Sequence, residues 1–145
     1  MSNFTAKFVL AVSFLMLGSV SAANAQIGPG ALKLNIPHSF VLRDKTYPAG
    51  EYTIRRTAST VDSPSLLILQ GKDESAIFDT IPTESVDPAK STQLVFDKVG
   101  DQYFLSKIWV KGEITGNEIT RTKSERKMIA AAEKKESQIV DVTGF

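Results

Sequence analysis

Stretches in which apolar and polar residues alternate recur along this chain, and a period of two is typical of β-strands. Turn-forming residues separate these stretches, for example at Tyr47–Gly50 and Gly71–Glu74. The predicted strands are Ala31–Ile36, Ser39–Arg43, Glu51–Thr57, Leu66–Gln70, Ala76–Ile81, Gln93–Phe96 and Tyr103–Val110, with a short edge strand within Lys111–Thr120 and a last strand or loose tail at Ile139–Val142.

The two strands within Ser91–Val110 form a predicted β-hairpin. A four-residue loop, Lys98–Asp101, would pair Phe96 with Tyr103, whereas a two-residue turn at Gly100 and Asp101 would set apolar residues against polar ones. We therefore predict the longer loop. Alternation then gives two faces that are both apolar, so we expect both to be covered. One face carries Leu94, Phe96, Tyr103, Leu105 and Trp109, and the other carries Val95, Phe104, Ile108 and Val110.

The pattern changes at Thr122, where a helix is predicted to begin. Thr122 and Glu125 have the spacing of a capping box, and the run to about Glu136 contains neither Gly nor Pro. Its apolar stripe is narrow, and we expect this stripe to pack over one face of the hairpin. The stripe consists of Met128, Ile129 and Ala132.

Six to eight short strands followed by a helix at about 122–136 predict a mainly β fold. The expected architecture is a single antiparallel β-sandwich or barrel with one C-terminal α-helix. The number of strands does not distinguish the sandwich from the barrel.

Residues 1–25 have the features of a signal peptide. Lys7 precedes the apolar run Phe8–Leu17, and Ala23-Asn24-Ala25 fits an A-x-A cleavage pattern, with a cut after Ala22 as the alternative. At about 1.5 Å per residue, so short a run does not span a hydrocarbon core of roughly 30 Å. We therefore expect an exported protein, periplasmic or extracellular, with no transmembrane anchor after cleavage and a single β-rich domain at 26–145.

Charge and cysteine content narrow the possible functions. Of the 17 basic residues, Lys7 lies in the predicted leader, and the other 16 balance the 16 acidic residues. A neutral domain has no overall attraction to nucleic acid or to anionic lipid, so neither is an expected partner. The chain contains no cysteine, which excludes thiol catalysis and cysteine-based metal sites.

Candidate catalytic residues are few, and we predict no catalytic site, no metal and no cofactor. His38 is the single histidine, and neighbours in an extended segment point to opposite faces, so it is badly placed to pair with Ser39. Asp79 and Asp97 lie inside apolar strands and are the carboxylates of most interest for a glycosidase-like pair. We expect both to face outward or to flank turns.

Trp109, Tyr103 and Lys107 are the candidate ligand-binding residues. An aromatic cluster beside a cation is common in the pockets of sugar and lipid binders. In the competing interpretation, which we favour, Trp109 is a core anchor and Lys107 extends its ammonium to solvent at the sheet edge.

Three segments of the chain carry a resemblance, namely Tyr47–Tyr52 (YPAGEY), Tyr103–Trp109 (YFLSKIW) and Thr122–Arg126 (TKSER). Together with the leader and the Leu34–Phe40 strand, they resemble a group of small exported β-rich proteins of soil bacteria that has no assigned activity. The resemblance implies a β-rich fold and transfers no functional residue.

These observations favour a non-catalytic exported β-domain that acts by binding or assembly in the cell envelope. One alternative is a lipocalin-like carrier of a small apolar ligand, which would need a closed barrel with an interior cavity. The other is a carboxylate-based hydrolase, which would need two acids that converge in a cleft. The expected partner is an envelope protein or a small apolar ligand.

Overall fold

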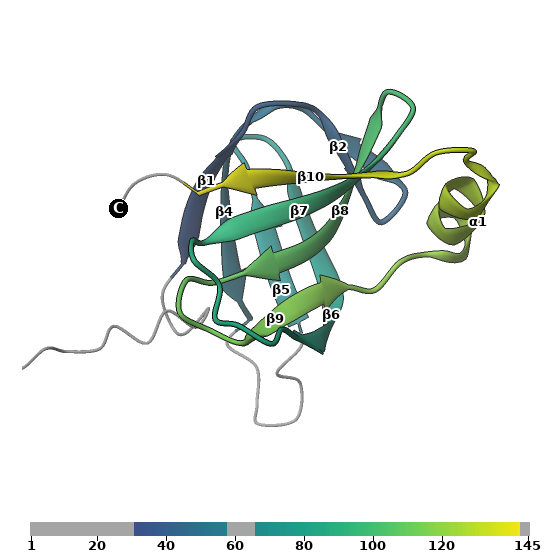
Figure 1. The fold of residues 1–145 in the computed structure, drawn as a ribbon. Helices are drawn as coiled ribbons and strands as arrows, with labels where there is room; N and C mark the ends of the chain where they lie inside the picture. The colour runs from purple at the N-terminus through teal and green to yellow at the C-terminus, as the bar shows by residue number, and fades with distance from the viewer. Residues whose placement is uncertain (1–30, 58–65, 143–145) are drawn as a thin grey trace, which may run out of the picture.

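The computed structural model describes residues 31–57 and 66–142, which are mainly β-strand with one α-helix (Figure 1). The predicted fold class is confirmed at this level. The predicted signal peptide (1–25), the residues that follow it (26–30) and the turn region at 60–64 lie outside the described residues. The described elements are β1 (Leu32–Ile36), β2 (Phe40–Leu42), β3 (Lys45–Tyr47), β4 (Gly50–Arg56), β5 (Leu66–Gln70), β6 (Ser75–Glu84), β7 (Gln93–Val99), β8 (Gln102–Trp109), β9 (Thr115–Ile119), α1 (Lys123–Ala131) and β10 (Glu136–Asp141).

All of these strands belong to one open, mixed sheet. Its neighbours run β1-β4-β5-β6-β9-β8, β8 also pairs with β7, and β7 pairs with β10. The short β2–β3 hairpin joins β8 through one parallel bridge between Val41 and Phe104. The described part of the chain thus has ten strands rather than six to eight, and the pairing is antiparallel apart from that bridge.

The sheet bends so that β7, β8, β9 and β10 pass in front of β1, β4 and β5 (Figure 1). β6 is ten residues long and pairs with β5 along one half and with β9 along the other, which carries the chain from one layer to the next. Apolar side chains fill the space enclosed by the bend. The largest fully buried ones in this core are Phe40, Phe78, Phe96, Ile36, Leu42, Ile54, Leu67, Leu69, Leu94 and Ile108.

The predicted β7–β8 hairpin is present, but its predicted loop is wrong. Val99 pairs with Gln102, so the turn is the two residues Gly100 and Asp101. Gly100 has φ 60°, which suits the first central position of a type II′ turn and matches the twist of the strands. Local turn chemistry therefore outweighed the mismatched rungs that the shorter turn creates.

A β-bulge corrects the register farther along β8. Phe96 pairs with Leu105, whereas Val95 pairs with Lys107, which leaves Ser106 as the extra residue. The predicted faces are consequently wrong beyond Leu105. Ile108 joins Leu94 in the core, and Trp109 moves to the outer face of the sheet, the face that points away from the core.

Both faces of the hairpin are covered near its turn, as expected. Asp97, Phe104 and Ser106 are buried although they lie outside the core cluster. Their burial shows that the outer face is covered at this end of β7 and β8.

The capping box that opens α1 is confirmed. The Thr122 hydroxyl accepts a hydrogen bond from the backbone N–H of Glu125, and the Glu125 carboxylate accepts one from the backbone N–H of Thr122, each 3.1 Å long. The helix ends at Ala131 rather than near Glu136, because the chain there becomes extended and enters β10. Pairing with β7 has replaced the helix that local propensity favours over those residues.

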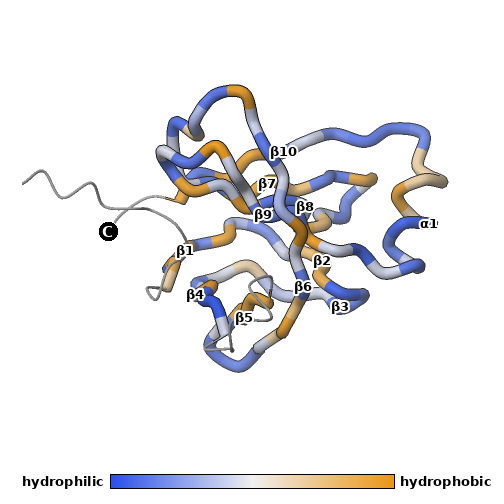
Figure 2. Tube along the Cα trace, turned by 90° about the horizontal axis from the view of Figure 1, so that it is seen from below, coloured by the Kyte–Doolittle hydropathy of each residue, from blue (hydrophilic) through white to orange (hydrophobic). Residues whose placement is uncertain are grey.

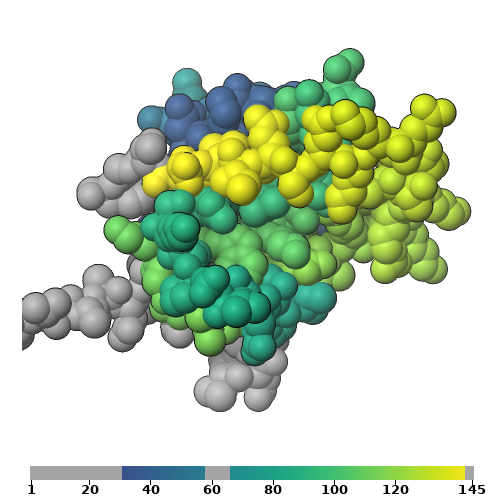
Figure 3. Space-filling model, in the orientation of Figure 1, coloured from purple at the N-terminus to yellow at the C-terminus, as the bar shows by residue number. Residues whose placement is uncertain are grey.

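The helix is held mainly by its first turn and not by its apolar stripe. Glu125 is 4% exposed, and its carboxylate also accepts a hydrogen bond from the backbone N–H of Asp44, in the β2–β3 turn. Met128 is 44% exposed. The segment from α1 to β10 is mostly hydrophilic (Figure 2), and α1 projects at one side of the molecule (Figure 3). The expected packing of the stripe over the hairpin is therefore not found.

Candidate functional site

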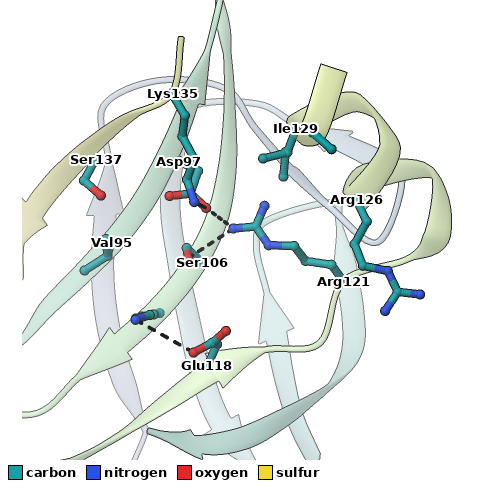
Figure 4. A pocket seen from close by; sticks show the side chains of 11 residues that line it. Val95, Asp97, Ser106, Glu118, Arg121, Arg126, Ile129, Lys135 and Ser137 are labelled. Atoms are coloured by element: carbon teal, nitrogen blue, oxygen red, sulfur yellow. Dashed lines mark hydrogen bonds and ion pairs between the residues drawn. The ribbon is translucent and has the colours of Figure 1, made fainter. Parts of the chain in front are cut away.

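A polar hollow lies between α1 and the outer face of the sheet (Figure 4). Its volume is about 390 Å³. Strands β7 to β10, the segments that flank α1 and one side of the helix all contribute to its lining. The lining residues are Val95, Asp97, Ser106, Lys107, Glu118, Arg121, Arg126, Ile129, Ala130, Lys135 and Ser137.

Asp97 is the central acid of this hollow. It is 3% exposed, and its Oδ2 forms ion pairs with Nη2 of Arg121 and, at 3.1 Å, with Nζ of Lys135. Nη2 of Arg121 also donates a hydrogen bond to the Ser106 hydroxyl at 3.1 Å (Figure 4). Burial of a carboxylate is costly without such partners, and these contacts offset that cost.

The three charged residues come from separate parts of the chain. Asp97 lies on β7 opposite Phe104, Arg121 lies between β9 and α1, and Lys135 lies between α1 and β10. The same carboxylate therefore binds one residue before α1 and one residue after it, and so attaches both ends of the segment between β9 and β10. Alternation from Phe104 puts the Ser106 hydroxyl on the same side of the sheet as Asp97, and the bulge then sets Lys107 opposite Val95, so Lys107 also lines the hollow.

The hollow carries an excess of positive charge. Four of its lining residues are cationic (Lys107, Arg121, Arg126 and Lys135), and two are acidic (Asp97 and Glu118). Glu118 faces Lys107 at 3.8 Å, whereas Asp97 alone faces two cations. In addition, Nη1 of Arg121 is buried and has no hydrogen-bond partner within residues 31–57 and 66–142.

Another ion pair joins the two residues that flank Lys135 in the sequence. Lys134 forms an ion pair of 2.6 Å with Glu136, and its hydrogen bond to that residue lowers the pKa of the Glu136 carboxyl. Both side chains are well exposed, so this pair is a weak, solvent-screened contact.

The capping box fixes where α1 begins relative to the hollow. Arg43 and Asp44 have φ of 55° and 64°, as a two-residue type I′ turn requires between Leu42 and Lys45. This turn presents the Asp44 backbone N–H to Glu125, and the Thr122 hydroxyl donates to the Asp44 carboxylate at 2.7 Å. The start of α1 is thereby attached directly to the sheet.

The three candidate ligand-binding residues do not converge. Tyr103 stacks on His38 with ring centroids 3.8 Å apart and packs against the core. Lys107 lines the polar hollow, and Trp109 lies on the outer face against Gly116, where it is partly exposed. Trp109 is therefore outside the core cluster of the described residues, and the three side chains do not form one pocket.

His38 is enclosed by aromatic rings. Besides its stacking on Tyr103, it meets the edge of Phe96 with centroids 4.9 Å apart, and its Nδ1 lies 3.2 Å from the backbone oxygen of Ser39. Its Nε2 is buried without a hydrogen-bond partner in the described part of the chain. Within the described residues, the His38 ring therefore contacts aromatic rings and a backbone oxygen, and no serine hydroxyl that it could activate.

The two aspartates singled out in the sequence have different surroundings. Asp79 is exposed and lies 3.9 Å from Arg43, as expected of an outward-facing acid. Asp97 is buried, contrary to that expectation. Two features of the sequence pointed toward a buried acid at Asp97, namely its place within an apolar strand and the surplus of basic residues near α1. The sequence did not show that Arg121 and Lys135 would be the residues that contact it.

Residues 31–57 and 66–142 contain no group of three or more His, Asp or Glu side chains arranged to hold a metal ion. Their single helix is too short and too polar to cross a lipid bilayer. No protein-family model, no curated protein and no solved structure matches this chain.

Proposed function

We propose that this chain is a non-catalytic exported β-domain that acts by binding or assembly in the cell envelope, and that the polar hollow beneath α1 is its binding site. The observation that carries the proposal is the position of the hollow. It opens on the outer face of the sheet, while apolar side chains fill the space inside the bend.

The filled interior favours this function over that of a lipocalin-like carrier. Such a carrier needs an empty, apolar volume within its sheet, whereas Phe40, Phe78 and Phe96 are each at most 1% exposed and lie within the core cluster. We further propose that the bent sheet is best regarded as an unclosed barrel, since β1 and β10 each have one paired neighbour.

The ion pairs of the hollow weigh against a carboxylate-based hydrolase. A glycosidase general acid is a carboxyl kept protonated by apolar surroundings. Asp97 instead contacts two cations, and Glu118 faces Lys107. This arrangement suits recognition of a charged group better than proton transfer.

The predicted leader supports the envelope as the location. When the full chain is produced in a Gram-negative host, we expect the periplasmic fraction to contain a chain that begins at Gln26, or at Ala23 if the cut follows Ala22. A Leu15→Arg variant, which breaks the apolar run, should remain unprocessed. A wild-type chain that keeps residues 1–25 inside the cell would refute export.

The proposal that the domain is non-catalytic is tested by incubating the purified chain with chromogenic esters, glycosides and phosphate esters. We expect the same background turnover from the wild type and from an Asp97→Asn variant. Turnover that the wild type shows and that Asp97→Asn loses, while the circular dichroism spectrum of the variant stays that of the folded wild type, would instead establish the hydrolase.

A further inference from the structure

We infer that the polar hollow binds an organic anion, that is, a carboxylate or a phosphate monoester carried on a short apolar body. This inference rests on the proposed binding function and specifies its ligand class. The anionic group would lie at Nη1 of Arg121 with Lys135 near it, and the apolar body would lie against Ile129 and Val95.

The charge of the cluster supports an anion. Asp97 supplies one negative charge to two cations, and Arg126 adds another positive charge at the rim. Arg126 is exposed and points away from Asp97 in Figure 4, so the acid does not neutralise it at close range. An anionic ligand would balance this excess, most strongly at Arg121, whose side chain is 17% exposed and is screened by water less than the exposed cations are.

The hydrogen-bonding capacity of Arg121 also favours an anion. Its Nη2 is bonded to Asp97 and Ser106, but its Nη1 lacks an acceptor in the described chain. A buried donor without a partner costs roughly 1–3 kcal/mol, and a guanidinium matches the two oxygens of a carboxylate or phosphate. A ligand oxygen at Nη1 would remove that cost.

The apolar part of the lining indicates what carries the charge. Ile129 and Ala130 line the hollow from α1, and Val95 lines it from β7. A volume of about 390 Å³ falls within the roughly 300–1,000 Å³ of small-molecule pockets. An inorganic anion would leave most of this space and its apolar wall without contact.

A route into the hollow is available at Lys135 and α1. The Lys135 side chain is 50% exposed and marks the entrance. Nη1 of Arg121 is closed to solvent, so the ligand must displace the Ile129 side of α1 slightly to reach it. The small packed area of this helix makes such a displacement feasible, since its stable attachment is at Thr122 and Glu125.

The test is calorimetric titration of the folded chain at low salt with four probes: phenyl phosphate, benzoate, inorganic phosphate and benzyl alcohol. We expect saturable one-to-one binding of phenyl phosphate, benzoate or both, and binding at least about tenfold weaker for inorganic phosphate and benzyl alcohol. The first two probes distinguish a phosphate from a carboxylate ligand.

Variants then locate the binding. Arg121→Lys keeps a cation beside Asp97 but removes Nη1, and Lys135→Gln removes the entrance charge while Arg121 still holds Asp97. Each should weaken binding by about tenfold or more with the circular dichroism spectrum unchanged. Arg55→Lys, on the exposed side of β4, is the matched control and should bind as the wild type does.

Two results would overturn the inference. Equal affinity of the wild type, Arg121→Lys and Lys135→Gln would place the binding elsewhere on the domain, which refutes this site but not the binding function. Absence of saturable binding of any of the four probes to the folded wild type would refute the ligand class. The proposed function fails separately, through cytoplasmic retention or through Asp97-dependent turnover.

Discussion

Arg121 and Asp97 form an ion pair on the outer face of the sheet, where Asp97 is 3% exposed and the Arg121 side chain is 17% exposed. Lys135 completes the cluster from the far side of α1. The segment that contains α1 is thus attached at both of its ends to one buried acid. This arrangement helps to explain how a helix that buries none of its apolar stripe completely is held beside the sheet.

Replacing Asp97 by Asn should destabilise the domain strongly. The substitution leaves the buried Arg121 guanidinium without its counter-ion, and removal of one partner of a buried ion pair typically costs about 3–5 kcal/mol. Denaturant unfolding monitored by circular dichroism measures this change. The matched control is Asp79→Asn, whose ion pair with Arg43 is exposed and should contribute less than about 1 kcal/mol. Equal losses in the two variants would show that the buried ion pairs of Asp97 contribute no more to the free energy of unfolding than the exposed ion pair of Asp79.

Thr122→Ala should loosen the attachment of α1. The Thr122 hydroxyl caps the helix and also donates to Asp44, so its loss should cost about 1–2 kcal/mol. Ser124→Ala, two residues after Thr122 and exposed, should change the stability by less than about 0.5 kcal/mol. Amide hydrogen exchange should accelerate in α1 and at Asp44 while β4 and β5 stay protected. Unchanged exchange at Asp44 would contradict the proposed attachment.

Gly116→Ala should destabilise the domain through Trp109. An added Cβ would lie 2.7 Å from Cε3 of Trp109, closer than carbon atoms can approach without displacement. We expect a loss of about 1–3 kcal/mol in the free energy of unfolding. The same change in a Trp109→Leu background should cost clearly less, because the ring is gone. If the two losses are equal, the ring does not cause the effect.

Alkaline pH should reveal the burial of Tyr52. Burial raises the pKa of Tyr52 above its ordinary 10.0, and that of Tyr47 in the same direction. A raised folded-state pKa contributes stability that is complete below the unfolded-state pKa and is lost as the pH rises through the folded-state value. Unfolding free energy should therefore fall as the pH rises above about 10.

Tyr52→Phe is the variant that tests this assignment. It should lose about 1 kcal/mol at neutral pH, because the Tyr52 hydroxyl donates a 2.6 Å hydrogen bond to the Pro48 carbonyl. Its stability should then fall less steeply than that of the wild type as the pH rises above 10. Denaturant midpoints at neutral and alkaline pH give both quantities, and parallel alkaline losses would contradict the assignment.

Local patterns predicted the elements well. The alternation within Leu32–Ile36, the β7–β8 hairpin and the Thr122–Glu125 capping box all follow from neighbours in sequence, and all are present. The Tyr47–Gly50 turn signal likewise falls between β3 and β4. Each of these features depends on residues that are only a few positions apart.

Apart from the hairpin turn at Gly100 and Asp101, where local turn chemistry decides, the errors arose where distant residues decide the structure. One inserted residue, Ser106, changes the face of everything beyond it in β8, and alternation alone does not reveal a bulge. The helix ends early because β10 pairs with β7. The candidate site depends on the meeting of Asp97, Arg121 and Lys135, which only the topology of the sheet brings about.

The proposed binding site is the hollow beneath α1 and not the interior of the sheet. Amide chemical-shift mapping of the isotope-labelled chain during titration with phenyl phosphate distinguishes the two locations. We expect the largest shifts at the lining residues Asp97, Ser106, Arg121, Ile129 and Lys135, while the amide resonances of Phe40, Phe78 and Leu69 stay unchanged. Shifts concentrated at those core residues would instead reveal an interior carrier site and refute the proposed location of binding.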